Sequence, residues 1–122
     1  MLSVSDQIDE GCALVRGGDA NLGVEVLLKA FDRKPGDMRL LLCLADGHAK
    51  NGNFQGAANF YERVLAKSGR HRIALLGAAQ AYEGLSYRAA ARVFYQQLQD
   101  QEPNNASARA FFAEEDALGK KP

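Results

Sequence analysis

The chain repeats one helical pattern with a period of 34 residues. After the turn at Gly52 and Asn53, apolar residues recur at the spacing that places them on one face of a helix. Residues of similar size and polarity recur 34 positions upstream and 34 positions downstream of this segment. Such a period restricts the fold to stacked helical hairpins, because a single hairpin cannot bury its own apolar face. The apolar residues of the segment are Ala57, Phe60, Tyr61, Val64 and Leu65.

Superposed at this period, the chain divides into three units and a last helix within one domain. The units cover about residues 4–37, 38–71 and 72–105, followed by a capping helix at 106–118 and a tail at 119–122. Each unit contains two helices joined by a turn, so about seven helices are expected. Their expected spans are 4–17, 20–33, 38–50, 72–84, 88–101 and 106–118, with a further helix between the turn at 52–53 and Ser68.

When the three units are superposed, residues 34 positions apart fall in the same column, and two such columns hold only small residues. Small side chains at facing positions let the two helices of a hairpin approach to packing distance. A third column holds large residues, at Leu27, Tyr61 and Tyr95. The small columns consist of Gly11, Ala45 and Ala79, and of Gly23, Ala57 and Ala91.

This pattern resembles the tetratricopeptide repeat (TPR), which has a 34-residue signature with small residues in those columns. The resemblance covers nearly the whole chain and implies an all-α fold, a right-handed solenoid of helical hairpins. Two departures are visible. Gly69 stands where Pro35 and Pro103 end the other units, and Ser86 replaces the glycine usual in the turn.

The two ends of the chain carry polar residues where a neighbouring hairpin would be absent. Gln7 and Glu10 occupy columns that hold mainly leucine in the later units. Capping of this kind is required of a solenoid. In the last helix, Phe111, Phe112 and Ala113 are expected to cover the third hairpin, while Glu114, Glu115 and Asp116 are expected to face water.

The resemblance also implies a concave groove lined by the first helix of each unit. A middle row of three apolar residues, Ile8, Leu42 and Leu76, is not required by packing within a hairpin, and is expected to hold a partner segment. An open alternative is that these residues meet a neighbouring chain or lie under mobile side chains. The full set of expected groove residues is Ser5, Ile8, Cys12, Val15, Arg39, Leu42, Asp46, Ala49, Ile73, Leu76, Gln80 and Glu83, continued by Ser107, Ala110 and Glu114.

One binding mode of similar proteins is not expected. Members that grip the terminal carboxylate of a chaperone tail use Lys, Asn and Arg in the groove. Here the corresponding positions hold Ile8, Cys12, Cys43 and Gly77. Hydrophobic anchoring is therefore expected to dominate.

The two cysteines, Cys12 and Cys43, fall at different levels of successive units and are expected to be free, mostly buried thiols. Free thiols indicate a reducing compartment, so a cytoplasmic location is expected, or a periplasmic one if a signal segment was removed. No stretch approaches 18 consecutive apolar residues, and the chain is expected to be soluble.

Catalysis, metal binding and nucleic-acid binding find no support in the sequence. Cys43 and His48 are five residues apart, which places them on different faces of a helix. The chain has no phosphate loop, nucleophile motif or metal motif. Its 15 basic and 15 acidic residues balance, so no overall field attracts a nucleic acid.

The sequence therefore predicts a non-enzymatic protein–protein interaction module without a cofactor. It would bind a partner peptide or helix in an apolar groove, as an adaptor, scaffold or chaperone. Two alternatives stay open. One is a chaperone or assembly factor for bacterial secretion or pilus assembly, and the other is a homo-oligomeric scaffold.

Overall fold

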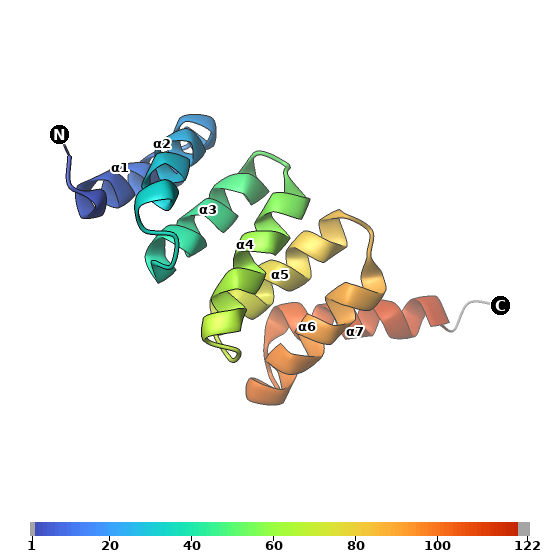
Figure 1. Ribbon diagram of the computed structural model, residues 1–122. Helices are drawn as coiled ribbons and strands as arrows, with labels where there is room; N and C mark the ends of the chain where they lie inside the picture. Colours follow the sequence, from blue (N-terminus) through green and yellow to red (C-terminus); the bar gives the residue numbers. More distant parts are fainter. Residues whose placement is uncertain (1, 120–122) are drawn as a thin grey trace.

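A computed structural model describes residues 2–119, and every regular element in this range is an α-helix. Figure 1 shows the helices stacked as successive hairpins, with the two ends of the chain at opposite ends of the stack. The all-α solenoid predicted from the sequence is confirmed. The helices are α1 (Val4–Arg16), α2 (Ala20–Arg33), α3 (Met38–Lys50), α4 (Phe54–Lys67), α5 (Arg72–Gly84), α6 (Arg88–Gln101) and α7 (Ala106–Gly119).

The helices begin and end within one residue of the expected positions. Six of these seven helices start at a side chain that accepts a hydrogen bond from the backbone N–H three residues further on, and so satisfies a donor that the helix itself leaves unpaired. Tyr87, which precedes α6, makes no such bond. Of the expected tail, Gly119 is the last residue of α7, and 120–122 lie outside the described residues. The capping residues are Ser3, Asp19, Asp37, Asn53, His71 and Asn105.

Each hairpin turn contains one residue with a positive φ at the same position of the repeat. The angles are +98° at Gly18, +78° at Gly52 and +63° at Ser86. Glycine adopts this left-handed conformation without steric cost, whereas a side chain makes it unfavourable. The third hairpin therefore makes the same turn as the others with a residue less suited to it.

The small columns bring the helices of each hairpin together, most closely in the first. A Cβ added at Gly23 would lie 2.9 Å from the backbone nitrogen of Val15 and 3.0 Å from the carbonyl oxygen of Gly11. Real Cβ atoms do not approach backbone atoms this closely. In the second and third hairpins the same columns hold alanines that are completely buried, namely Ala45, Ala57, Ala79 and Ala91.

The expectation of free cysteines is wrong, because Cys12 of α1 and Cys43 of α3 form a disulfide with their Cα atoms 5.4 Å apart. The prediction was wrong because it assumed that equivalent residues of neighbouring units lie side by side. Residues in the same column of α1 and α3 do not lie side by side. Instead α3 is offset by about one helical turn relative to α1. Cys43 therefore meets Cys12, and Arg39 pairs with Asp9, which is an offset in the same direction.

Among residues 2–119, none of the helices has both the length and the apolar character needed to cross a membrane.

Candidate functional site

Two surface hollows lie along the first helices of the successive units. The first hollow has a volume of about 320 Å³ and lies where α1, α3, α4 and α5 meet. The second hollow has a volume of about 230 Å³ and lies between α5, α6 and α7. The first is lined by Cys12, Val15, Arg16, Arg39, Leu42, Cys43, Asp46, Tyr61 and Ile73. The second is lined by Gln80, Glu83, Tyr95, Ser107, Ala110, Phe111 and Glu114.

The structure brings most of the expected groove residues to these hollows. Six of the twelve line the first, namely Cys12, Val15, Arg39, Leu42, Asp46 and Ile73. Gln80 and Glu83 line the second, together with Ser107, Ala110 and Glu114, which the sequence places in the same columns. Ser5, Ile8, Ala49 and Leu76 line neither hollow.

The expected open row Ile8–Leu42–Leu76 is not present as a continuous surface. Ile8 is only 1% exposed and belongs to a core cluster that includes Leu40 and Leu44 of α3. The cause is again the one-turn offset, because it brings α3 over the face of α1 that carries Ile8. Leu42 and Leu76 are half-buried, and Leu76 packs against the core beside α7.

Tyr61 reaches the first hollow from the second helix of its hairpin. A Cβ at Gly77 would lie 2.3 Å from Cζ of Tyr61, so glycine at this position of α5 leaves the room that the ring occupies. Burial, and secondarily the negative charge of Asp46, raise the pKa of Tyr61 to about 12. The hydroxyl therefore stays protonated at neutral pH and can donate a hydrogen bond.

Exposed ion pairs surround the first hollow. Arg39 pairs with Asp9, and Nζ of Lys50 lies 3.2 Å from a carboxylate oxygen of Asp46. Both pairs are close to half exposed, and pairs of this kind contribute little to stability. Their charged groups can therefore exchange partners at small cost when a ligand arrives.

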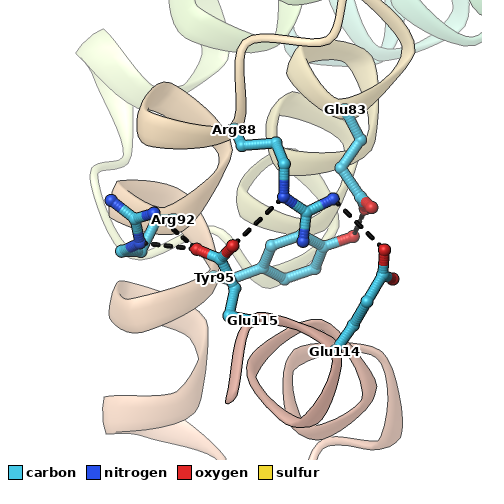
Figure 2. Close-up of polar contacts among 6 residues, drawn as sticks. All are labelled: Glu83, Arg88, Arg92, Tyr95, Glu114 and Glu115. Atoms are coloured by element: carbon cyan, nitrogen blue, oxygen red, sulfur yellow. Dashed lines mark hydrogen bonds and ion pairs between the residues drawn. The ribbon is translucent and has the colours of Figure 1, made fainter. Parts of the chain in front are cut away.

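The second hollow has an aromatic floor. The rings of Tyr95 and Phe111 stack with their centroids 4.6 Å apart. The Tyr95 hydroxyl donates a hydrogen bond to Glu83, as Figure 2 shows. Burial raises the pKa of Tyr95, and this hydrogen bond and the charge of Glu83 raise it further. The residue thus holds the Glu83 carboxylate in place at the edge of the hollow.

Ion pairs attach α7 to α6 beside the second hollow (Figure 2). Nε of Arg92 and Nε of Arg88 donate to the two oxygens of Glu115 at 2.8 Å and 3.1 Å. The Arg88 guanidinium also lies 4.7 Å from the ring centroid of Phe111 and 3.5 Å from Glu114. Hydrogen bonds from Arg92 and then Arg88 lower the pKa of Glu115, against an opposing effect of burial.

These contacts correct the expectation for the last helix. Phe111 is buried and Phe112 half-buried, as expected of residues that cover the third hairpin, but Ala113 is exposed. Glu115 is half-buried and bound by two arginines rather than facing water. The spacing of the acidic residues within α7 does not reveal the arginines of α6 that bind Glu115.

Sequence reasoning missed Tyr61 and Tyr95 as groove residues, although it placed both in one column of large side chains. The sequence does contain a feature that indicates their role, in the residue that stands 16 positions after each tyrosine. There Tyr61 meets Gly77 and Tyr95 meets Phe111. A large residue opposite a glycine or another ring indicates a side chain that passes between two neighbouring hairpins.

The two histidines have structural positions. His48 stacks on Phe60 with centroids 5.5 Å apart, and its Nδ1 lies 3.2 Å from the side-chain nitrogen Nδ2 of Asn53. Burial lowers its pKa. Nδ1 of His71 accepts a hydrogen bond from the backbone of Ala74 and caps α5. Within residues 2–119, no three His, Cys, Asp or Glu side chains gather in a way that could hold a metal ion.

Comparison with known proteins identifies the fold. No family model matches the sequence, and no curated protein does. The structure of the first TPR domain of RPAP3 (Spaghetti) bound to the HSP90 peptide SRMEEVD is similar at a TM-score of 0.84 and 19% identity, covering 96% of this chain and 94% of that one. A mutant of MamA is similar at a TM-score of 0.86 and 17% identity, covering 98% of this chain and 70% of that one. The Sgt2 TPR domain from Aspergillus fumigatus is similar at a TM-score of 0.79 and 16% identity, covering 98% of this chain and 84% of that one. The chain has the TPR fold.

Proposed function

We propose that this chain, a TPR solenoid, is a non-enzymatic module that binds an extended or helical segment of a protein partner. The binding surface is the groove formed by the first and second hollows. The observation that carries the proposal is the apolar character of the first hollow, where Ile73 is 53% exposed beside Leu42 and Tyr61. An exposed apolar cluster with a polar rim is the usual anatomy of a protein-binding surface.

The rim of the first hollow supplies groups that can fix the register of the segment. Arg16, Arg39 and Asp46 lie at its edge and can bond the backbone or side chains of a partner. Because the two hollows are small, at about 320 and 230 Å³, we expect a complex of the transient class, with an affinity on the order of micromolar.

The mode of binding differs from recognition of a terminal carboxylate by a cluster of cations. The structurally similar RPAP3 domain is bound to an HSP90 peptide. In this chain Cys12 and Cys43 form a disulfide in the wall of the first hollow, and Gly77 lies against Tyr61. These positions supply no cationic group. Arg16 and Arg39 lie at the edge of the hollow, so apolar contact is expected to provide most of the affinity and the two arginines to fix the register.

A paired substitution tests the groove. Changing both Leu42 and Ile73 to Glu places two charges in the first hollow and should abolish capture of the partner from an extract of the source cells. The helical circular dichroism spectrum should be retained, because both side chains are partly or largely exposed. The matched control is Leu22→Glu with Leu28→Glu on α2, at 43% and 41% exposure and outside both hollows. Equal capture by the groove variant and the wild type would refute the proposal.

The disulfide favours an oxidising compartment, and this is compatible with one more specific candidate, an assembly factor for secretion or pilus subunits in the bacterial periplasm. Disulfides persist in oxidising compartments and are rare in the cytosol. The expectation of a cytoplasmic location depended on free thiols, which this chain does not have. Acid quenching of source cells, followed by labelling of the denatured protein with a maleimide polymer before and after reduction, tests this candidate. An unshifted band before reduction and a band shifted by two labels after it would support the oxidised location, and labelling without reduction would refute it.

A further inference from the structure

The disulfide between Cys12 and Cys43 joins neighbouring hairpins at a position where the later junctions of the solenoid have no covalent bond. The chain contains no other cysteine. One period further on, the same two columns hold Asp46 and Gly77, and two periods further on they hold Gln80 and Phe111. The hairpins pack at these later junctions through non-covalent contacts. The repeat itself therefore does not require a cross-link in these columns.

The two cysteines differ in their exposure. Both line the first hollow, but Cys12 is only 2% exposed and belongs to a core cluster, whereas Cys43 is half-buried at the margin of that cluster. A thiolate breaks a disulfide by attacking one of its two sulfur atoms, so access decides which sulfur reacts. A thiol that enters the hollow therefore reaches Cys43 more readily than Cys12.

Each cysteine has an arginine one turn away on its own helix. Arg16 follows Cys12 by four residues, and Arg39 precedes Cys43 by four, a spacing that places side chains on the same helix face. Both arginines line the first hollow. Asp46 and Arg39 are each paired with a neighbouring side chain, whereas Arg16 forms no ion pair within residues 2–119. A positive group beside a partly exposed cysteine stabilises the thiolate, and this is the usual setting of a reactive sulfur.

We propose that the disulfide is a thiol-exchange site, and that a cysteine of the partner segment enters the first hollow to react with it. The partner's thiolate attacks Sγ of Cys43, a bond forms between these two sulfurs, and the bond to Cys12 breaks. Cys12 leaves as a thiolate near Arg16 and takes up a proton from water. One disulfide replaces another, so no further oxidant or reductant is needed. Attack by the Cys12 thiolate on Cys43 reverses the step and releases the partner.

The hollow can persist while the disulfide is exchanged, because other contacts also join α1 to α3. Ile8 packs in one core cluster with Leu40 and Leu44. Nζ of Lys50 donates a hydrogen bond to the carbonyl oxygen of Val15 at 3.3 Å. The inference rests on the proposed function and refines it, since the partner is then a segment with an apolar residue and a reduced cysteine.

A small thiol tests the reacting sulfur without the partner. The oxidised full chain is incubated with 2-mercaptoethanol in native buffer, quenched with acid, alkylated and analysed by mass spectrometry. The probe should be found on Cys43 and the alkyl group on Cys12, at least tenfold more often than the reverse. An equal distribution, a preference for Cys12, or reaction only after denaturation in urea would overturn the exchange site.

Substitution of Arg16 tests its role as the cation near the leaving sulfur. Arg16→Gln should slow the reaction with 2-mercaptoethanol at least threefold, and Arg16→Lys should restore most of the rate. The matched control is Arg109→Gln, which removes an exposed arginine of α7 that does not line the first hollow and should leave the rate unchanged. An unchanged rate in Arg16→Gln would overturn the assignment of Arg16.

Selection from two peptide libraries separates this inference from the proposed function. Random dodecapeptides with one cysteine each, and the same library with serine in its place, are selected on the wild type without reductant. Cysteine peptides should be released only by dithiothreitol and be linked to Cys43, and Leu42→Glu with Ile73→Glu should prevent their capture. Serine peptides captured equally well would overturn the exchange with a partner and leave the proposed function standing. Cysteine peptides captured equally by the Leu42→Glu, Ile73→Glu variant would overturn the groove, and the reaction with 2-mercaptoethanol would still decide the exchange site.

Discussion

The first and third hairpins have the same 34-residue plan but are held to their neighbours by different forces. The first hairpin has glycine at both close-packing positions, glycine in its turn, and a disulfide from α1 to α3. The third has alanine at the close-packing positions, Ser86 in its turn, and a cap, α7, attached through ion pairs and stacked aromatic rings.

This difference predicts different sensitivities at the two ends of the groove. A covalent bond and buried apolar contacts do not respond to salt or to protonation of carboxylates. Ion pairs between exposed groups are weakened by both. The Arg39–Asp9 pair between α3 and α1 is about half exposed on both sides and adds little to the attachment of the first hairpin. The wall of the first hollow should therefore depend mainly on redox conditions, and the wall of the second on pH and ionic strength.

Removal of the disulfide should have the largest effect. Changing Cys12 and Cys43 to Ala should lower the free energy of unfolding by about 2–4 kcal/mol, because the unfolded chain regains the freedom that the cross-link restricts. The measurement is urea denaturation followed by circular dichroism. Reductant should destabilise the wild type by a similar amount and leave the double variant unchanged. If complete reduction left the stability of the wild type unchanged, the disulfide would not be what holds the first hairpin to its neighbour.

A bulkier residue in the first hairpin should have the next largest effect. Gly23→Ala brings a Cβ to within 2.9 Å of the Val15 nitrogen, and the backbone of the hairpin must open to relieve the contact. The expected loss is about 1–3 kcal/mol, the usual cost of overpacking. Asn21→Ala, on the exposed side of the same helix, should cause no loss. Equal stability of the two variants would show that the first hairpin is no more tightly closed than the third.

The sequence predicts the fold well because the period, the caps and the breakers are local features. Pro35 and the turn at Gly52 mark helix boundaries whatever the neighbouring hairpins do. Small columns such as Gly11 and Ala45 identify the facing sides of two helices within one hairpin. The register between hairpins has no such marker, since it depends on how ridges of one helix fit the grooves of the next.

The candidate site was predicted less completely for this reason. Superposition at one period places Ile8 beside Leu42, whereas the structure pairs Cys12 with Cys43, 31 residues later. A one-turn offset therefore turns an expected groove residue, Ile8, into a core residue and two expected free thiols into a disulfide. The second hollow depends on Tyr95, which reaches it from the other helix of its hairpin.

Exchange of the turn residues should have a smaller effect of opposite sign in the two hairpins. Ser86→Gly removes a side chain from a left-handed position and should stabilise the protein by up to about 1 kcal/mol. Gly18→Ser in the first hairpin should destabilise it by a similar amount. A Cβ at Gly18 would have no neighbour within 4 Å, so its effect comes from the backbone conformation alone. Thermal unfolding of both variants and of their combination measures the effect, and a loss of stability in Ser86→Gly would contradict it.

The smallest expected effect is the pH dependence of the cap. Hydrogen bonds from Arg92 and Arg88 hold the pKa of Glu115 below its ordinary value of 4.5. A carboxyl group with a lower pKa in the folded protein contributes stability that is fully present above its unfolded pKa and is lost as the pH falls through the folded value. Glu115→Gln should therefore lower the urea midpoint at pH 7. It should also make the fall of the urea midpoint between pH 5 and pH 3 less steep than in the wild type.

Substitution of the arginine that bonds Glu115 most strongly separates this effect from general acid sensitivity. Arg92→Gln should raise the pKa of Glu115, measured from its side-chain carboxyl resonance, and should flatten the acid decline as Glu115→Gln does. High salt should act on the wild type in the same direction, because it screens exposed ion pairs. Reduction of the disulfide should leave the slope of the decline unchanged, since the cross-link contains no group that titrates in this range. A slope that changed with the disulfide but not with Arg92 would reverse the assignment of forces to the two ends of the groove.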